Sequence, residues 1–518
     1  MTSDAGGRPA AARPNLLVVV VDQLAGTLFP DGAPAPFLHA PHLRALAARS
    51  ARFAQAYAAS PLCAPARASL MSGLLPSRTG VFDNAAEFAS HIPTFAHHLR
   101  RAGYQTCLVG KMHFVGPDQL HGFEERLTTD IYPADFGWTP DWTRPHERVG
   151  WWYHNLGSVA AAGTAETTNQ LEYDDEVAHH ALAKLRDLAR RRDPRPWCLA
   201  VSFTHPHDPY VARPRHWDLY RDCPALDPEV GPVPLEAHDP HSRRILEACD
   251  HAAYDIRPED VRRARRAYFA SISYIDDQLG EMLGVLERTG MAEDTAVVFV
   301  SDHGDMLGER GLWFKMSFRE PSARVPLTIA APGLPAGRVD APVSALDLAP
   351  TLLALAGLDP EAAMPGSDGR SLLPLAQGAG GRGPVPMEYM AEASVAPMVA
   401  LRAGAWKLAL CEADPPQLFD LARDPLERFD LAADPDHAAT RARLEAEARG
   451  RWDLARLDAT VRESQARRHL VYEALRRGAY YPWDFEPLQR ASERYMRNHL
   501  DLDALEAERR VPPPAPSG

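Results

Sequence analysis

One cysteine in this 518-residue chain lies in a segment suited to nucleophilic chemistry. Cys63 is followed by Pro65 and Arg67 and by small residues that predict a helix over 66–73. The start of a helix offers free N–H groups and the positive end of the helix dipole, which favour a bound anion. A lone cysteine is more often buried and inert. The chemical interpretation therefore depends on whether other segments supply cations, acids and bases.

Two aspartates occupy positions typical of a divalent metal site. Asp22 ends the apolar run that begins at Asn15. Asp302 and His303 follow a second such run, 295–301. Ligands gather at the carboxyl ends of strands in doubly wound sheets, so these groups are expected to lie together. Their oxygen atoms suit calcium or magnesium, and the imidazole adds manganese as a third candidate. The alternative for either aspartate alone is the capping of a turn.

Further segments supply cations and proton carriers. Lys111 and His113 follow one strand-like run, and His205 and His207 follow another, between prolines. We take His207 before His205 as the group that protonates a leaving oxygen, and Lys315 as a second lysine. The alternative is that the histidines are ordinary loop polar groups and that Lys315 is solvated.

Taken together, these motifs resemble those of the type I sulfatases of the alkaline phosphatase superfamily. The resemblance implies that a formylglycine-generating enzyme oxidises Cys63 to formylglycine, whose aldehyde hydrate attacks sulfur and later expels sulfate. The implied catalytic residues are Cys63, Arg67, Lys111, His113, His207 and Lys315. The implied metal ligands are Asp22, Cys63, Asp302 and His303. Gln23 and His303 depart from the commonest family pattern, so the divalent cation stays open: Ca²⁺ first, with Mg²⁺ or Mn²⁺ as alternatives.

An aromatic-rich segment, 132–153, has the ring faces that binding of a quaternary ammonium group requires. Ring faces hold such a cation, each desolvated ring contributing about 0.5–2 kcal/mol. The alternative is that these rings form a lid or a subunit contact. The segments 80–88, 464–468, 483–485 and 495–499 resemble the choline-sulfatase branch of the family, which implies choline sulfate as substrate. The expected substrate-binding residues are Asn84, Trp138, His154 and Glu388, with Glu392 as a second candidate to balance the ammonium charge.

The hydrophobic pattern predicts an α/β fold. Continuous apolar runs of buried strands (15–22, 106–110, 197–204, 295–301 and 325–330) alternate with helical patterns (42–51, 94–102, 174–192 and 259–289). We expect a sulfatase-like, mostly parallel sheet flanked by helices, with a small C-terminal α+β subdomain and an extended tail. The expected division is a disordered N-terminus (1–14), a catalytic domain (15–383), a small antiparallel-sheet subdomain (384–450) and a C-terminal extension (451–518).

Composition limits the remaining function classes. The chain carries 56 Lys and Arg against 69 Asp and Glu, a net charge of −13, which disfavours nucleic acid as a partner. Six cysteines without a C-x-x-C pattern indicate a reducing compartment, and we expect a cytoplasmic location. The apolar run 16–21 is too short for a membrane span. The aromatic-bearing extension is expected to bury itself against another subunit, giving a homo-oligomer, either a dimer or a tetramer.

Other functions stay open at this stage. A phosphonate monoester or phosphodiester hydrolase of the same superfamily shares the cysteine, metal and lysine motifs. An arylsulfatase would fit if the aromatic segment faces away from the site. A non-catalytic binder of quaternary ammonium compounds would need no oxidation of Cys63.

Overall fold

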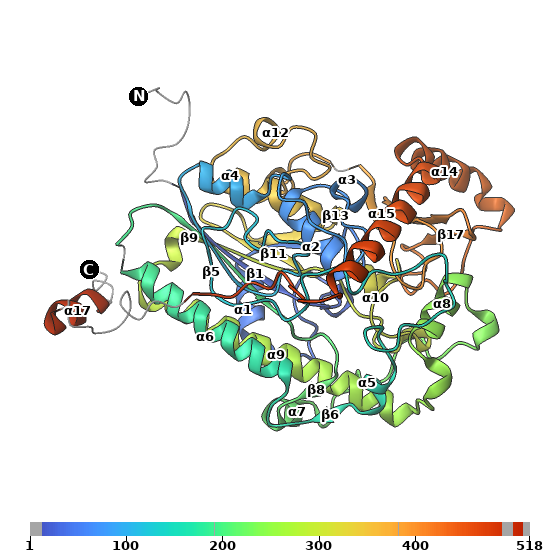
Figure 1. The fold of residues 1–518 in the computed structure, drawn as a ribbon, viewed down its shortest axis with the longest axis horizontal. Coiled ribbons are helices and arrows are strands. Elements are labelled where there is room, and N and C mark those ends of the chain that lie inside the picture. Colours follow the sequence, from blue (N-terminus) through green and yellow to red (C-terminus); the bar gives the residue numbers. More distant parts are fainter. Residues whose placement is uncertain (1–12, 191, 382, 489–500, 511–518) are drawn as a thin grey trace.

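An eight-stranded, mostly parallel sheet forms the centre of the structure (Figure 1). It is a computed structural model that describes residues 13–190, 192–381, 383–488 and 501–510. The strand order is β12-β2-β11-β9-β1-β7-β4-β5. The central four strands are parallel neighbours: β9 (Thr295–Ser301), β1 (Asn15–Val21), β7 (Trp197–Phe203) and β4 (Gln105–Gly110). The outer strands are β12 (Gly337–Val339), β2 (Ala51–Phe53), β11 (Leu327–Ala330), which runs antiparallel to β9, and β5 (Glu125–Arg126).

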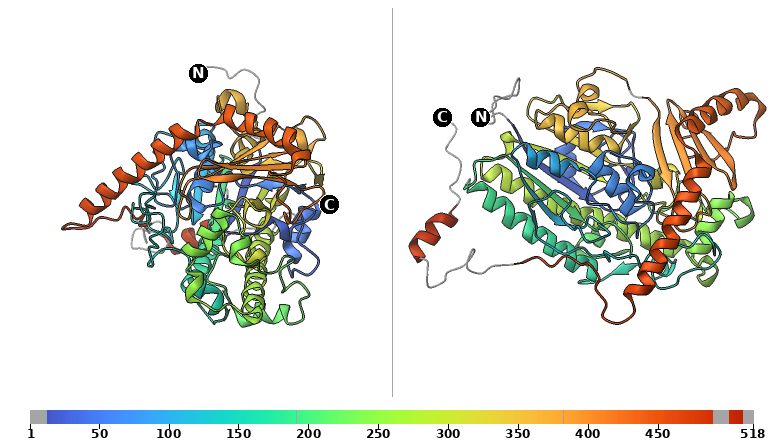
Figure 2. Two further views of the ribbon diagram at one scale, coloured as in Figure 1. Left: turned by 90° about the vertical axis from the view of Figure 1, so that its right-hand side faces the viewer. Right: turned by 45° about the horizontal axis from the view of Figure 1, so that its top comes forward.

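Helices cover both faces of this sheet because its strands are apolar on both faces. Along β1, Leu17, Val19 and Val21 pack on one side and Leu16 and Val18 on the other, as expected from the alternation of side chains along a strand. The first side holds α1 (Pro41–Ala48), α6 (Asn169–Ala189) and α9 (Pro258–Arg288). The second side holds α2 (Cys63–Ser72), α4 (Phe95–Arg101) and α11 (Leu348–Leu355). Figure 2 shows the two helical layers on either side of the sheet.

A smaller antiparallel sheet follows in the chain, in the order β14-β15-β16-β17. Its strands are β14 (Val385–Tyr389), β15 (Met398–Ala403), β16 (Trp406–Cys411) and β17 (Asp414–Asp420). Leu444 and Ala448 of α14 (Ala438–Arg451) pack on it, together with Trp452. The long helix α15 (Leu454–Leu475), orange-red in Figure 1, then crosses back over the α/β body, and α17 (Leu502–Arg509) is the last described helix.

The structure confirms the predicted fold class, and local differences have simple physical causes. The expected strand 325–330 is interrupted at Pro326, which lacks an N–H to donate, so it forms β10 (Arg324–Val325) and β11. The apolar segment 343–357 begins as the short strand β13 (Val343–Ser344), and α11 starts only at Leu348. Helix α2 begins at Cys63 itself, three residues before the expected start. Most of the expected N-terminal segment (1–12), and the segment 495–499, lie outside the described residues.

None of the helices in the described part of the chain combines the length and the apolar character that crossing a membrane requires.

Gly110 ends β4 immediately before Lys111, at a φ of 100° that side chains rarely adopt. A Cβ there would also clash with the carbonyl oxygen of Ser202 on β7. We expect Gly110→Ala to lower the free energy of unfolding by about 3 kcal/mol or more, from overpacking added to backbone strain. Thermal or urea unfolding measures this loss.

Gly103 is the matched control, because its φ is 91° but nothing lies within 4 Å of a Cβ built on it. Gly103→Ala should therefore cost only about 1 kcal/mol, from the backbone conformation alone. Equal losses in the two variants would contradict the close approach of β4 and β7 described here.

Candidate active site

Four neighbouring parallel strands carry polar residues at their carboxyl ends, and these residues converge. Asp22 follows β1, Asp302 follows β9, Lys111 follows β4, and His207 lies in the loop after β7. Cys63 is the first residue of α2, whose N-terminal end faces the same point. This convergence is the consequence of parallel strand order. It brings together residues up to 280 positions apart, namely Asp22, Cys63, Lys111, His207 and Asp302.

Arg67 lies at the centre of this convergence and is completely buried. Its guanidinium donates to Asp302 at 2.8 Å, to Asp22 at 3.2 Å and to the Ser202 hydroxyl at 2.8 Å. Burial alone raises the pKa of Asp22, but the charges of Lys111 and Arg67 hold that pKa well below its usual value. Asp22 is therefore ionised, and Arg67 fixes the orientation of both carboxylates.

Four side chains form a donor set suited to a divalent cation. One ligand atom each from Asp22, Cys63, Asp302 and His303 lies within 4.8 Å of all the others, and all four residues are buried. His303 Nδ1 lies 3.0 Å from the Gly304 carbonyl oxygen and must donate to it, so Nε2 is free to bind a metal. Nε2 lies 3.1 Å from Cys63 Sγ. Two carboxylates and an imidazole fit Ca²⁺, Mg²⁺ or Mn²⁺.

A lysine–histidine pair lies beside Cys63. His207 Nδ1 is 2.6 Å from the Asp208 carbonyl oxygen, which can only accept, so this nitrogen carries the proton. His207 Nε2 then accepts from Lys315 Nζ at 2.7 Å. Burial, followed by the charge of Lys315, holds the pKa of His207 well below its usual value. The transferable proton therefore resides on Lys315, which also donates to Gln23 Oε1 at 2.6 Å.

His205 is turned away from this pair. Its Nδ1 lies 2.6 Å from Asp174 Oδ2 on α6, and Asp174 also accepts the N–H and hydroxyl of Thr204. His205 is therefore bound to α6, whereas His207 lines the pocket beside Cys63.

Left-handed backbone conformations cluster around the same centre. Gln23, His113, Phe314 and Met316 have φ angles of 63°, 54°, 61° and 74°. Such angles cost of order 1–3 kcal/mol each in residues other than glycine and persist only where the surrounding structure enforces them. Phe314 and Met316 flank Lys315, and Gln23 follows Asp22. These backbone conformations thus determine the directions in which the neighbouring side chains of the site point.

A pocket of about 290 Å³ extends from Cys63 to an aromatic end. Cys63, His207 and Lys315 line its inner end, and the rings of the outer end include Trp138 and Trp152, which stack with ring planes 9° apart. The remaining lining includes Asn84, Tyr132, Tyr153, His154, Asp208 and Glu392. Asn84 Oδ1 also accepts the N–H of Ala64 at 3.0 Å. His113 lies against Trp138, and neither ring nitrogen has a hydrogen-bond partner among the described residues.

The expectation that Glu388 lines this pocket is wrong. Its carboxylate accepts three hydrogen bonds outside the pocket, from the N–H and hydroxyl of Ser77 and from Trp452 Nε1, all at 2.6 Å. Glu392, the second candidate, lines the pocket instead and is 5% exposed. Within the described residues its Oε2 has no hydrogen-bond partner. Burial, followed by the nearby Asp83, raises the pKa of Glu392 to about 7.

Sequence reasoning did not single out Asp208, which binds both histidines of the pocket. Its carboxylate lies 3.3 Å from His154 Nδ1 and 3.2 Å from His207 Nδ1. The sequence feature that could have identified Asp208 is its position directly after His207. Tyr132 and Trp152 were noted only as members of the aromatic segment.

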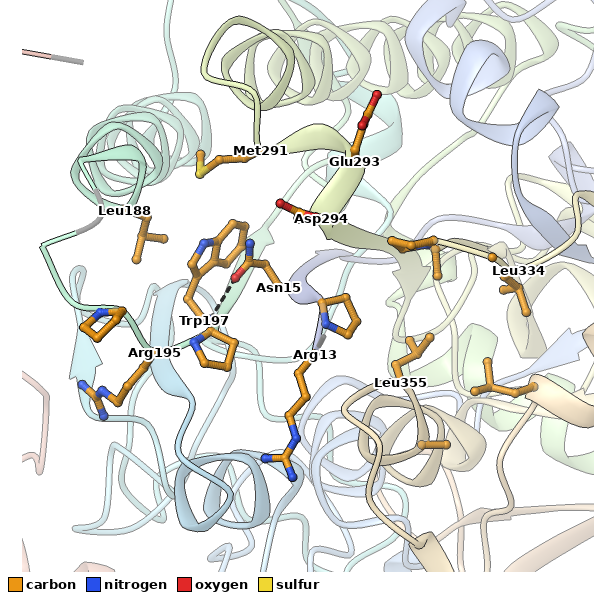
Figure 3. Close-up of a pocket in the computed structure, with 18 of the residues that line it drawn as sticks. Arg13, Asn15, Leu188, Arg195, Trp197, Met291, Glu293, Asp294, Leu334 and Leu355 are labelled. Atoms are coloured by element: carbon orange, nitrogen blue, oxygen red, sulfur yellow. Dashed lines mark hydrogen bonds between the residues drawn. The ribbon is translucent and has the colours of Figure 1, made fainter. Parts of the chain in front are cut away.

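A second cavity, of about 500 Å³, lies at the amino ends of the parallel strands, opposite to the residues around Cys63 (Figure 3). Asn15 and Trp197 begin β1 and β7 there, and the Asn15 side chain accepts the N–H of Trp197 at 3.2 Å. Seven residues of β1, roughly 20 Å of strand, separate this cavity from Asp22. It therefore plays no part in the constellation around Cys63.

Three family descriptions match the chain. The one described as Sulfatase matches residues 14–358, which contain the whole constellation. The one described as "N-sulphoglucosamine sulphohydrolase, C-terminal" matches residues 308–451, and "Choline sulfatase enzyme C terminal" matches 459–511.

Individual relatives agree with these matches. A protein named Choline-sulfatase from Rhizobium meliloti (strain 1021) is 63% identical over 96% of this chain and 99% of its own length. The multifunctional alkaline phosphatase superfamily protein PehA of Trinickia caryophylli is 30% identical over 71% of this chain and 78% of its own. The crystal structure of phosphonate monoester hydrolase of Agrobacterium radiobacter superposes with a TM-score of 0.65 at 26% identity, covering 87% of this chain and 96% of that one. The chain belongs to the sulfatase family.

Proposed function

We propose that the protein is a choline-sulfatase, which converts choline O-sulfate and water into choline and sulfate. The near full-length similarity to a relative of that name supports this proposal. The observation that carries it is the form of the pocket. The pocket lined by Cys63 and Lys315 is also lined by the stacked Trp138 and Trp152, and by Glu392, whose Oε2 has no hydrogen-bond partner among the described residues.

The two ends match the two charges of the substrate. A trimethylammonium group donates no strong hydrogen bond and is held by ring faces and by a carboxylate, as Trp138, Trp152 and Glu392 provide. The sulfate needs cations already in place around its oxygens, as Lys111 and Lys315 provide. Asn84, between the two ends, is proposed to contact the ester, and His154 to line the cation end. A neutral aryl group would leave the carboxylate of Glu392 without its partner.

Each residue at the inner end has a proposed task. Lys315 and His207 together deliver the proton to the leaving alkoxide oxygen, because Lys315 holds that proton against His207 Nε2. Arg67 keeps Asp22 and Asp302 aligned. His113 is buried close to Cys63 and is proposed to contact the nucleophile. The rings of Tyr132 and Trp138 exclude water from these groups.

Two groups of the family complete the proposal. Formylglycine, formed from Cys63 by a formylglycine-generating enzyme, supplies an aldehyde hydrate as the nucleophile. A divalent cation held by Asp22, Asp302, His303 and the modified residue 63 supplies charge neutralisation at the sulfate, with Ca²⁺ taken first.

Assembly and location are also proposals. The proposed division is a catalytic domain (15–383), a small subdomain (384–450) and an extension (451–518). Exposed apolar side chains in the extension support a homo-oligomeric contact there: Leu470, Val471, Tyr480, Tyr481 and Leu488. The sparse cysteine pattern favours the cytoplasm.

Steady-state kinetics with three substrates tests the function. We expect kcat/KM for choline sulfate to exceed that for nitrophenyl sulfate by about 100-fold or more, since the cation end contributes only to the first. The likeness to a phosphonate monoester hydrolase makes nitrophenyl phenylphosphonate the third substrate. A higher kcat/KM for that ester than for choline sulfate would replace the proposal with phosphonate hydrolysis.

The pH dependence should show the charge of Glu392. Its carboxylate binds the ammonium only when ionised, and burial raises its pKa to about 7. The ratio of kcat/KM for choline sulfate to that for nitrophenyl sulfate should therefore rise about tenfold between about pH 6 and pH 8. Dividing by the second substrate cancels the titration of groups common to both, Lys315 and His207 included. Glu392→Gln should abolish this rise and lower kcat/KM for choline sulfate about 10- to 100-fold.

Glu388→Gln is the matched control, because Glu388 is an equally buried glutamate outside the pocket. It should keep both the ratio and its pH dependence. A pH rise that survives in Glu392→Gln and is lost in Glu388→Gln would reverse the assignment of the two glutamates.

A further inference from the structure

The inner face of α15 holds three separate segments that build the cation end of the pocket. These segments are 82–84, which carries Asn84; 138–142, which begins at Trp138; and 390–395, which carries Glu392. Leu457 and Val461 of α15 pack with Phe82, Trp142 and Met390 in one small apolar cluster. The helix therefore contacts all three segments at once.

A buried ion pair lies at the centre of this contact. Arg468 donates to both oxygens of Asp83 at 2.7 Å, and the two side chains are 7% and 0% exposed. Arg468 also donates to the Thr139 hydroxyl at 3.0 Å, so one guanidinium ties two of the segments together. A bidentate pair fixes direction as well as distance. Asp83 precedes Asn84, whose side chain accepts the N–H of Ala64 beside Cys63.

Trp142 connects the helix to the third segment. Gln465 accepts the backbone N–H of Trp142 at 3.1 Å, and Trp142 Nε1 donates to the Ala391 carbonyl oxygen at 3.0 Å. Arg462 donates to the carbonyl oxygens of Trp142 at 3.2 Å and Val395 at 2.7 Å. Glu392 follows Ala391 directly, so α15 determines where the backbone before and after this glutamate lies.

The charged groups of the sulfate end make their ion pairs and side-chain hydrogen bonds within the α/β body and not with α15. Arg67 and Lys111 bind Asp22, and Lys315 binds Gln23 and His207, all of them in the α/β body. Disturbing the contact with α15 thus leaves the anion-binding groups in place.

We infer that α15 is a specificity element and Arg468 a positioning residue, which through Asp83 and Thr139 aligns Asn84, Trp138 and Glu392 for an alkyl sulfate that carries a quaternary ammonium group. This inference rests on the proposed function and adds the part of the chain that sets its selectivity. Loss of Arg468 releases the segments 82–84 and 138–142 from their shared support, which weakens binding of the cation and spares the sulfate.

Arg468→Met tests the inference, with Arg467→Met as control. Arg467 lies on the outer face of the same helix, 67% exposed, and pairs with Glu463. In Arg468→Met, KM for choline sulfate should rise about tenfold or more while kcat changes less than about threefold. kcat/KM for nitrophenyl sulfate should stay within about threefold of the unchanged protein, and Arg467→Met should match it on both substrates.

Two further variants keep the test decisive. The double variant Asp83→Asn with Arg468→Met removes both charges together, so it replaces the single variant if that protein does not fold. It should still raise KM for choline sulfate and leave KM for nitrophenyl sulfate unchanged. Arg468→Lys keeps the charge but not the bidentate geometry. Its KM for choline sulfate should therefore lie between that of the unchanged protein and that of Arg468→Met. A parallel loss on both substrates, or no loss on either, overturns the inference. Failure of the unchanged protein to hydrolyse choline sulfate would instead overturn the proposed function.

Discussion

The buried pairing of Arg67 with Asp22 and Asp302 is the interaction on which the rest of the site depends. Two carboxylates from neighbouring strands, Asp22 and Asp302, are completely buried, and a buried charge without a partner is costly. Removing one partner of such a buried group typically costs about 3–5 kcal/mol, because uncompensated charge remains. Arg67 lies one turn into α2, so the helix that presents Cys63 also carries the charge that organises the metal donors.

The constellation combines this charge balance with backbone strain. Gln23, His113, Phe314 and Met316 hold left-handed conformations beside groups that must point at the substrate. Phe314 and Met316 pack into the core that α6, α9 and the central strands form, and close packing of this kind maintains a strained backbone conformation. The α/β body thus holds the charged groups around Cys63, while the proposed cation-binding end consists of loops that contact α15. The two parts of the pocket consequently depend mainly on different elements of the fold.

The convergence of polar residues around Cys63 could be predicted from the sequence, because these residues follow apolar strand patterns and parallel strands place their carboxyl ends together. Asp22, Lys111, His207 and Asp302 were all found this way. The cation end was harder. Glu388 and Glu392 are near neighbours in the sequence. Only the hydrogen bonds of Glu388 with Ser77 and Trp452 show that its carboxylate is not available to the pocket. Asp208 and the pairing of Arg468 with Asp83, 385 residues apart, leave no local pattern to read.

The central claim is that an aldehyde formed at residue 63 carries the reaction of a cationic sulfate ester. The most direct measurement combines the mass of the peptide containing Cys63 with choline release from choline sulfate, for protein produced with and without a formylglycine-generating enzyme. The account predicts that release is proportional to the fraction in which a –CH₂SH group has become a –CHO group. Full activity of protein that retains the thiol at residue 63 would contradict it.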